Sequence, residues 1–179
     1  MSSSRTSPSS QRRAEAWQLL AQILFSQGEG DAPQSTGRPA GGASELAESR
    51  DVFMPLPAAT AYAMVKRGLP SRSLLPLAEC LGLSKDAVAA YVGLDRATAH
   101  RKITRGDTLP IHAAESMLRL LELCRLAEDT FTNPETAAAW LRTAHPMLGA
   151  DAPFDWAKSA YGTAHVKEIL TAIKYGNSV

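Results

Sequence analysis

From about residue 55 to residue 176, apolar residues recur at three- and four-residue spacing, and no stretch alternates apolar and polar positions as a half-buried strand does. Ser84, Asp95 and Asn133 fit helix N-caps, and glycines follow several of the periodic segments, where helices commonly end. About eight helices are expected, at 57–66, 71–81, 85–92, 96–104, 110–130, 134–143, 153–159 and 163–175. The pattern therefore predicts an all-α protein, a helical bundle.

The first fifty residues follow a different pattern. Residues 1–10 are mostly serine and are expected to be disordered, and residues 28–50 have the Gly-, Ser- and Pro-rich composition of a linker. Between them, residues 11–27 place Ala16, Leu19, Leu20, Ile23 and Leu24 on one helical face. An isolated helix of this length is marginal in water, so we interpret this segment as a weakly docked or disordered arm.

The helix at 110–130 is apolar over most of its surface and carries one narrow charged stripe of alternating sign. The stripe suits a solvated face with i,i+3 and i,i+4 pairs. Its members are Glu115, Arg119, Glu122, Arg125 and Asp129. So wide an apolar surface predicts either a central strut between two modules or a contact with a second protomer.

Residues 85–104 have the pattern of a helix-turn-helix. Ala89 is small where the two helices would cross, and Gly93 stands in the turn, where a positive φ is needed. The apolar positions expected to pack the pair are Val88, Val92, Leu94 and Ala99. One departure is Lys102, which stands where many such helices carry an apolar residue.

The second of these helices is locally basic although the whole chain has a net charge of only +1. Across 93–106 there are four basic residues and one acidic residue, a net +3. The candidate DNA-binding residues are Arg96, Thr98, His100, Arg101, Lys102 and Arg105. Arg and Thr early in such a helix suit base edges and methyl groups, whereas Lys102 and Arg105 suit phosphates. A helical hairpin with a solvated basic face is the alternative.

Catalytic and metal-binding patterns are weak. The four histidines are widely spaced, and Asp155, Ser159 and His165 lack the strand-turn-helix context of a catalytic triad. Cys80 and Cys124 lie among apolar residues and are expected to be buried free thiols. There is no apolar run long enough to span a membrane and no secretory signal pattern. We therefore expect a cytoplasmic protein that is not an enzyme, with no metal, no cofactor and no membrane partner.

Several short motifs, in their order and spacing, resemble the Xre-type antitoxins of RES–Xre toxin–antitoxin pairs. The resemblance covers about residues 55–177, and departs from the family at Trp156, usually aliphatic, and at Ala150-Asp151, where glycine is common. The motifs are GLP at 68–70, LGLS at 81–84, RATAHRK at 96–102, AAESMLRLLEL at 113–123, AAAWLRTAHPMLG at 137–149, AP at 152–153, YG at 161–162 and IKYG at 173–176.

This resemblance implies an antitoxin that binds and silences a RES-domain toxin that consumes NAD. It also implies that the antitoxin represses its own operon by binding operator DNA, and that it forms a homodimer or a larger toxin–antitoxin assembly. It places the toxin contact at the last helix and tail, where the Val179 carboxylate could stand in for a phosphate at the toxin's NAD site. The candidate toxin-binding residues are Lys167, Lys174, Tyr175, Gly176, Asn177, Ser178 and Val179. The alternative is a stand-alone transcriptional regulator that dimerises through its C-terminal module.

The expected organisation has four parts. Residues 1–54 are the flexible arm with a possible short helix, and residues 1–50 are expected to be dispensable for toxin binding. Residues 55–109 form the helix-turn-helix domain, 110–130 the connecting long helix, and 131–179 the toxin-binding domain.

Overall fold

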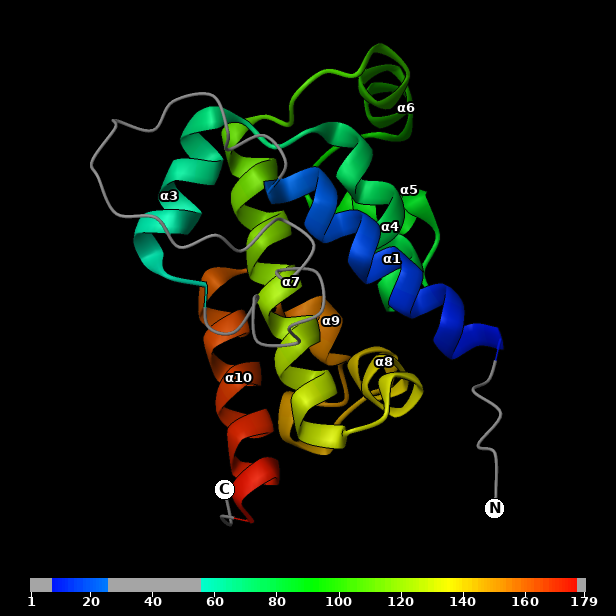
Figure 1. Cartoon of the computed structure of the whole chain (residues 1–179). Coiled ribbons are helices and arrows are strands. Elements are labelled where there is room, and N and C mark those ends of the chain that lie inside the picture. Colours follow the sequence, from blue (N-terminus) through cyan, green and yellow to red (C-terminus); the bar gives the residue numbers. More distant parts are fainter. Residues whose placement is uncertain (1–7, 26–55, 177–179) are drawn as a thin grey trace, which may run out of the picture.

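The computed structural model describes residues 8–25 and 56–176, and within these ranges every regular element is a helix (Figure 1). An isolated β-bridge joins Pro70 to Thr108. The predicted all-α class is confirmed. In chain order the elements are α1 (Pro8–Phe25), α3 (Ala58–Arg67), η3 (Ser71–Ser73), α4 (Leu74–Leu81), α5 (Lys85–Tyr91), α6 (Arg96–Arg105), α7 (Ile111–Phe131), α8 (Pro134–Arg142), η4 (Pro146–Leu148), α9 (Pro153–Trp156) and α10 (Ala160–Tyr175).

The predicted N-caps are confirmed at three helices. The side-chain oxygens of Ser84, Asp95 and Asn133 each accept the backbone N–H three residues later, at 3.1, 2.9 and 3.0 Å. Three elements after residue 55 differ from the prediction by more than one residue, and one of them is α9, which ends at Trp156 and not at 159. The segment expected as one helix at 71–81 opens with the 3₁₀ turn η3, and α10 starts at Ala160 because Ser159 caps it.

α7 runs through the middle of the molecule, with α1, α3, α4, α8 and α10 arranged around it (Figure 1). Its buried positions lie on several sides of the helix, so it contributes to the core along most of its length. This central position is what the strut alternative requires, and contact with a second protomer stays a prediction. α7 ends at Thr132, whose φ of 58° is left-handed, and the chain turns there into α8.

The interpretation of residues 11–27 as a weakly docked or disordered arm is wrong. α1 packs along α4, and Leu20 and Leu24 are fully buried in the common core. Arg67, at the end of α3, donates to the carbonyl of Leu24 at 3.1 Å. Sequence reasoning treated the helix as isolated, but burial of its apolar face against α4 supplies the stability that a helix of this length lacks alone.

The charged stripe of α7 is also not the solvated face that the spacing predicted. The Arg125 side chain is only 11% exposed and lies over the Trp17 ring of α1, 4.7 Å from its centroid. Glu122 and Asp129 pair instead with lysines of α10. Two neighbouring helices therefore cover much of the stripe, and its charges join elements together.

Candidate DNA-binding and partner-binding surfaces

α5, a four-residue turn (92–95) and α6 form the predicted helix-turn-helix. Gly93 in the turn has a φ of 77°, a left-handed conformation that glycine adopts without the Cβ penalty. The packing positions expected from the sequence are all buried: Val88, Ala89, Val92, Leu94 and Ala99. α6 lies at one end of the molecule, away from the end of α10 (Figure 1).

The six candidate DNA-binding residues do not all share one environment on α6. Arg96, His100, Arg101 and Arg105 are exposed. Thr98 is half-buried, and its hydroxyl oxygen is 3.5 Å from Arg101 Nη2, which donates to it. The half-buried Lys102 donates to the carbonyl of Thr108 at 3.2 Å, so an apolar residue is not required at this position.

Three further residues bear on this surface and were missed from the sequence. Ala97 and Thr104 are exposed and, at helical spacing, lie on the same outward side as His100 and Arg101. Asp86, on α5, pairs with Arg96 at 3.2 Å and offsets part of the positive charge. Because Asp86 lies outside the basic segment in the sequence, only the packing of α5 against α6 could reveal this pair.

The turn before α6 carries one perturbed acid. The pKa of Asp95 is lowered, chiefly because its carboxylate accepts the backbone N–H of Thr98 at the start of the helix. A carboxylate here also meets the positive end of the helix dipole. Asp95 therefore stabilises the start of α6 in its ionised form, and its charge belongs to the helix cap.

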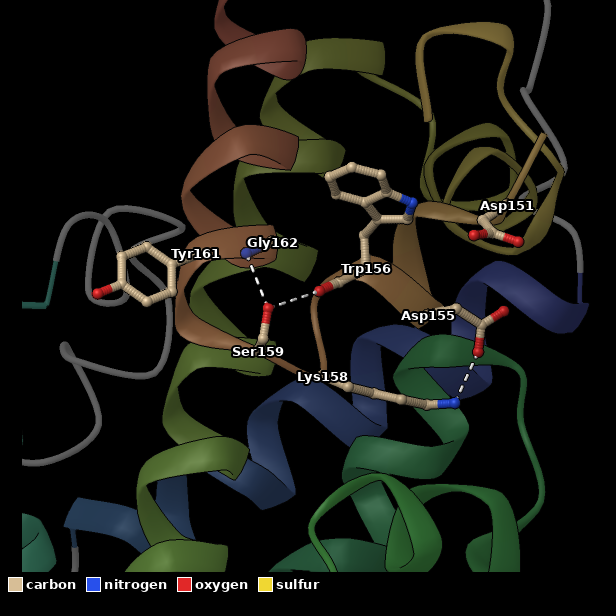
Figure 2. A pocket seen from close by; sticks show the side chains of 7 residues that line it. All are labelled: Asp151, Asp155, Trp156, Lys158, Ser159, Tyr161 and Gly162. Carbon is tan, nitrogen blue, oxygen red and sulfur yellow. Dashed lines mark hydrogen bonds and ion pairs between the residues drawn. The ribbon is translucent and has the colours of Figure 1, made fainter. Parts of the chain in front are cut away.

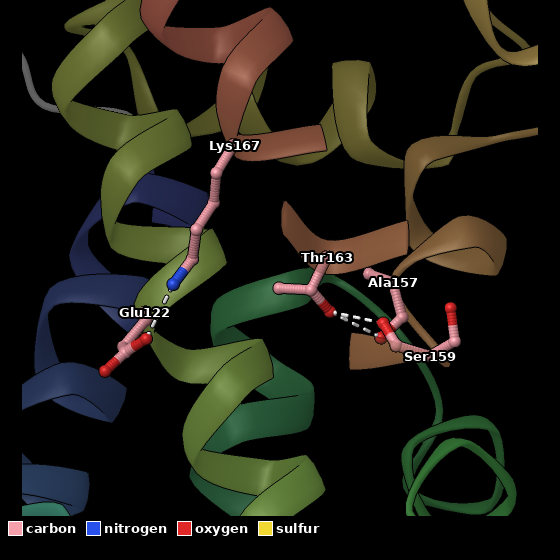
Figure 3. Close-up of polar contacts among 5 residues, drawn as sticks. All are labelled: Glu122, Ala157, Ser159, Thr163 and Lys167. Atoms are coloured by element: carbon pink, nitrogen blue, oxygen red, sulfur yellow. Dashed lines mark hydrogen bonds and ion pairs between the residues drawn. The ribbon is translucent and has the colours of Figure 1, made fainter. Parts of the chain in front are cut away.

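α10 packs against α7 through Val166, Ile169 and Leu170, all buried. Lys167 donates to Glu122 at 2.7 Å, as Figure 3 shows, and Lys174 pairs with Asp129. The hydrogen bond to Asp129 is the main reason why the pKa of Lys174 is raised. Both candidate toxin-binding lysines are thus engaged with α7.

The end of α10 differs from these lysines. Tyr175 is 66% exposed, and Gly176 is exposed too. The remaining candidates, Asn177, Ser178 and Val179, lie outside the described residues. Of the predicted toxin-binding set, Tyr175 is therefore the aromatic side chain that the structure presents to solvent, next to the exposed but ion-paired Lys174.

The corner between α9 and α10 depends on a glycine. A Cβ on Gly162 would lie 1.9 Å from the carbonyl oxygen of Trp156, so no larger residue fits without a backbone shift. Next to it, the Thr163 hydroxyl donates to the carbonyls of Ala157 and Ser159, each at 2.9 Å (Figure 3). The YG motif at 161–162 thus has a steric reason for its glycine.

The same corner is tied to the helix-turn-helix. The Tyr91 hydroxyl, at the end of α5, donates to the carbonyl of Ala157, and the Tyr91 ring lies 4.7 Å from that of Phe154. Burial raises the pKa of Tyr91, which keeps the phenol protonated as a donor. The unit that carries α6 and the unit that carries α10 are therefore joined directly as well as through α7.

The remaining candidate chemistry is inert. Cys80 and Cys124 are buried free thiols as predicted, and burial raises the pKa of both, which disfavours the reactive thiolate. Residues 8–25 and 56–176 contain no group of three His, Cys, Asp or Glu side chains arranged to hold a metal ion. In the same ranges, no helix is both long and apolar enough to cross a membrane.

These features define a helix-turn-helix unit joined to a helical binding module. Residues 60–122 match the antitoxin Xre-like helix-turn-helix domain, and residues 126–176 match the antitoxin Xre/MbcA/ParS C-terminal toxin-binding domain. A comparison with curated proteins gives no match. The chain belongs to the Xre-type antitoxins, as the sequence motifs predicted. Its role is that of an antitoxin, and both of its domains belong to non-enzymatic regulatory families.

Proposed function

We propose that this antitoxin inhibits a RES-domain toxin that consumes NAD, and that it represses its own operon through α6. The observation that carries the proposal is the separation of the two surfaces: α6 and the end of α10 lie at opposite ends of the molecule (Figure 1). An operator and a toxin can thus be held at the same time without competing for one face.

On the DNA side, the exposed residues of α6 supply the contacts. His100 and Arg101 face outward and are proposed to reach base edges, with Ala97 and Thr104 beside them for thymine methyl groups. Arg105 is exposed and is proposed to contact a phosphate.

Arg96 and Lys102, two other candidates on α6, already have partners within the protein. Arg96 would release Asp86, and Lys102 would release the Thr108 carbonyl, before either binds phosphate. One α6 offers few phosphate contacts, so binding is proposed to need a homodimer on a palindromic site.

On the toxin side, the proposed contact comprises Tyr175, Gly176 and the residues Asn177, Ser178 and Val179 that follow. Tyr175 is 66% exposed, with Lys174 Nζ 5.5 Å from its ring centroid. Lys167 and Lys174 reach the toxin only by exchanging their partners on α7, so they are proposed to contribute to binding after the tail has docked.

The test is co-expression with a RES-domain protein encoded beside this chain, followed by NAD turnover by the purified complex. The expected result is a stable complex with suppressed turnover, and release of turnover when the chain is truncated after Gly176. Full neutralisation by the truncated chain would assign inhibition to the folded module instead. If no complex forms while operator binding persists, the chain acts as a stand-alone regulator.

Operator binding is tested by gel shift on the chain's own promoter. Arg101→Ala is expected to weaken binding by about 1–3 kcal/mol, the range for losing a base-edge contact. Asp107→Asn, which changes an exposed residue just after α6 and removes no basic side chain, is the matched control. Equal affinity of wild type and Arg101→Ala at moderate salt would contradict the assignment.

A further inference from the structure

A surface hollow of about 540 Å³ lies where α9 meets the first turn of α10 (Figure 2). Trp156 and Gly162 line it, together with the side chains of Asp151, Asp155, Lys158 and Tyr161. It belongs to the segment that matches the toxin-binding domain, but it is separate from the last turn of α10 and the tail.

The hollow carries one uncompensated negative charge. Asp155 pairs with Lys158 at 2.7 Å, so these two charges offset each other. The Asp151 carboxylate makes no ion pair or side-chain hydrogen bond with any residue in the described parts of the chain. In Figure 2 it lies beside the indole of Trp156. A cation that enters the hollow therefore meets a free carboxylate and an aromatic ring together.

The Trp156 ring is held in place for contact. Trp156 donates from Nε1 to the carbonyl of Leu148 at 3.0 Å, and its ring lies 5.4 Å from that of His165. Tyr161 is 91% exposed, an unusual state for a large aromatic side chain that has no partner to cover it. The fixed Trp156 ring beside the Asp151 carboxylate suits a guanidinium group, which stacks on the ring and pairs with the acid.

Tyr161, at one edge of the hollow, lies on the same side of α10 as Tyr175. Tyr161, Ala164, Glu168, Thr171 and Tyr175 follow at helical spacing, and all are exposed. The 14 steps from Tyr161 to Tyr175 span about 21 Å at a rise of about 1.5 Å each, a length that one protein interface of ordinary size covers. A toxin bound at the tail can therefore follow this face as far as the Tyr161 edge of the hollow.

We propose that the hollow at the α9–α10 corner is a second docking point for the toxin, and that it receives an arginine side chain of the toxin. The inference rests on the proposed function, since it assumes that the toxin binds α10. The tail is then the inhibitory contact, and the hollow orients the toxin against α10.

The test measures affinity for the purified RES-domain toxin with Asp151→Asn and Tyr161→Ala, two exposed positions where folding should not change. Each variant is expected to weaken the complex about tenfold, and Asp151→Asn should also reduce the dependence of affinity on salt. Asp107→Asn, the same charge change near α6, is the control and should bind the toxin like wild type. Thermal unfolding verifies that all variants fold.

The outcomes separate the two proposals. Wild-type affinity in both Asp151→Asn and Tyr161→Ala overturns the hollow as a docking point and leaves the proposed function standing. Failure of the wild-type chain to bind the toxin overturns both. In a charge swap, a toxin Arg→Glu variant that loses binding is expected to regain it with Asp151→Arg. If no toxin arginine behaves in this way, the arginine assignment is overturned.

Discussion

α1 and α10 both reach the charged stripe of α7, but they use it in different environments. On the α1 side, Trp17 donates to Glu128 at 2.8 Å, and Arg125 pairs with the same carboxylate at 3.1 Å among largely buried side chains. On the α10 side, Lys167 pairs with Glu122 where both groups are partly exposed. The ion pair of Arg125 with Glu128 therefore belongs to a buried contact with a fixed orientation. The ion pair of Lys167 with Glu122 is screened by solvent.

α1 and α10 also differ in whether they lie within the matched family domains. α10 lies within the matched toxin-binding domain, whereas α1 lies before the first matched residue, position 60. α1 nevertheless packs against α4 of the helix-turn-helix unit and against α8 of the toxin-binding unit. This chain thus has an additional helix that braces the two family domains against each other.

The largest expected effect tests whether α1 is part of the core. Leu20→Ala, at a fully buried position, is expected to lower the free energy of unfolding by about 3 kcal/mol through lost burial and a residual cavity. The adjacent Leu19→Ala is the control, because Leu19 is 48% exposed and its loss should change stability by about 0.5 kcal/mol or less. Urea unfolding measures both.

Equal effects of Leu20→Ala and Leu19→Ala on stability would support the interpretation of α1 as a weakly docked arm. The same packing revises the prediction that residues 1–50 are dispensable for toxin binding. Their deletion removes α1, and it is now expected to destabilise the chain and to lower the yield of folded complex.

A smaller effect is expected from the buried hydrogen bond. Trp17→Phe keeps a ring at the joint but removes the donor to Glu128, and it should lower the free energy of unfolding by about 2 kcal/mol, the range for a buried acceptor that loses a partner. Trp140→Phe, on α8, is a comparison that removes an indole from the other half of the protein. Little change in Trp17→Phe would mean that water replaces the indole N–H.

A weaker effect still is expected on the α10 side. Lys167→Ala removes the pair with Glu122 and should lower stability by about 0.5 kcal/mol, as is usual for partly exposed ion pairs. The loss should shrink further at 1 M salt, whereas the effect of Trp17→Phe should persist, because screening acts mainly on solvent-exposed charges. If Lys167→Ala lowers stability more than Trp17→Phe does, and equally at low and high salt, the α10 side is the more strongly stabilised of the two.

The smallest expected effect is a pH dependence on the α1 side. Desolvation by burial raises the pKa of Glu128 above its ordinary value of 4.5, and the hydrogen bond from Trp17 and the charge of Arg125 offset this only in part. The folded state then binds more protons than the unfolded state, so this group's contribution to stability falls as pH rises from 4.5 through the folded pKa.

Glu128→Gln removes this titration while keeping an oxygen that accepts the Trp17 bond. Unfolding measured between pH 4.5 and 7 should show wild type losing stability relative to the variant as pH rises. A parallel pair of curves would contradict the raised pKa.

Local sequence signals determined much of the fold. The caps at Ser84, Asp95 and Asn133, the turn at Gly93 and the buried thiol Cys124 were read correctly, because each depends on residues within one or two turns. The order of short motifs also predicted the antitoxin family, which the domain matches confirm.

Only the tertiary structure decided which surfaces are covered. A helical pattern shows that α1 has an apolar face but not whether α4 is there to bury it, and a charged stripe looks the same whether water or α10 lies beside it. The pairs Trp17–Glu128 and Lys167–Glu122 join residues 111 and 45 positions apart. The periodicity of a sequence reflects contacts between residues a few positions apart. The stability of α1 and α10 depends instead on partners distant in the sequence, which only the packing of the whole chain brings together.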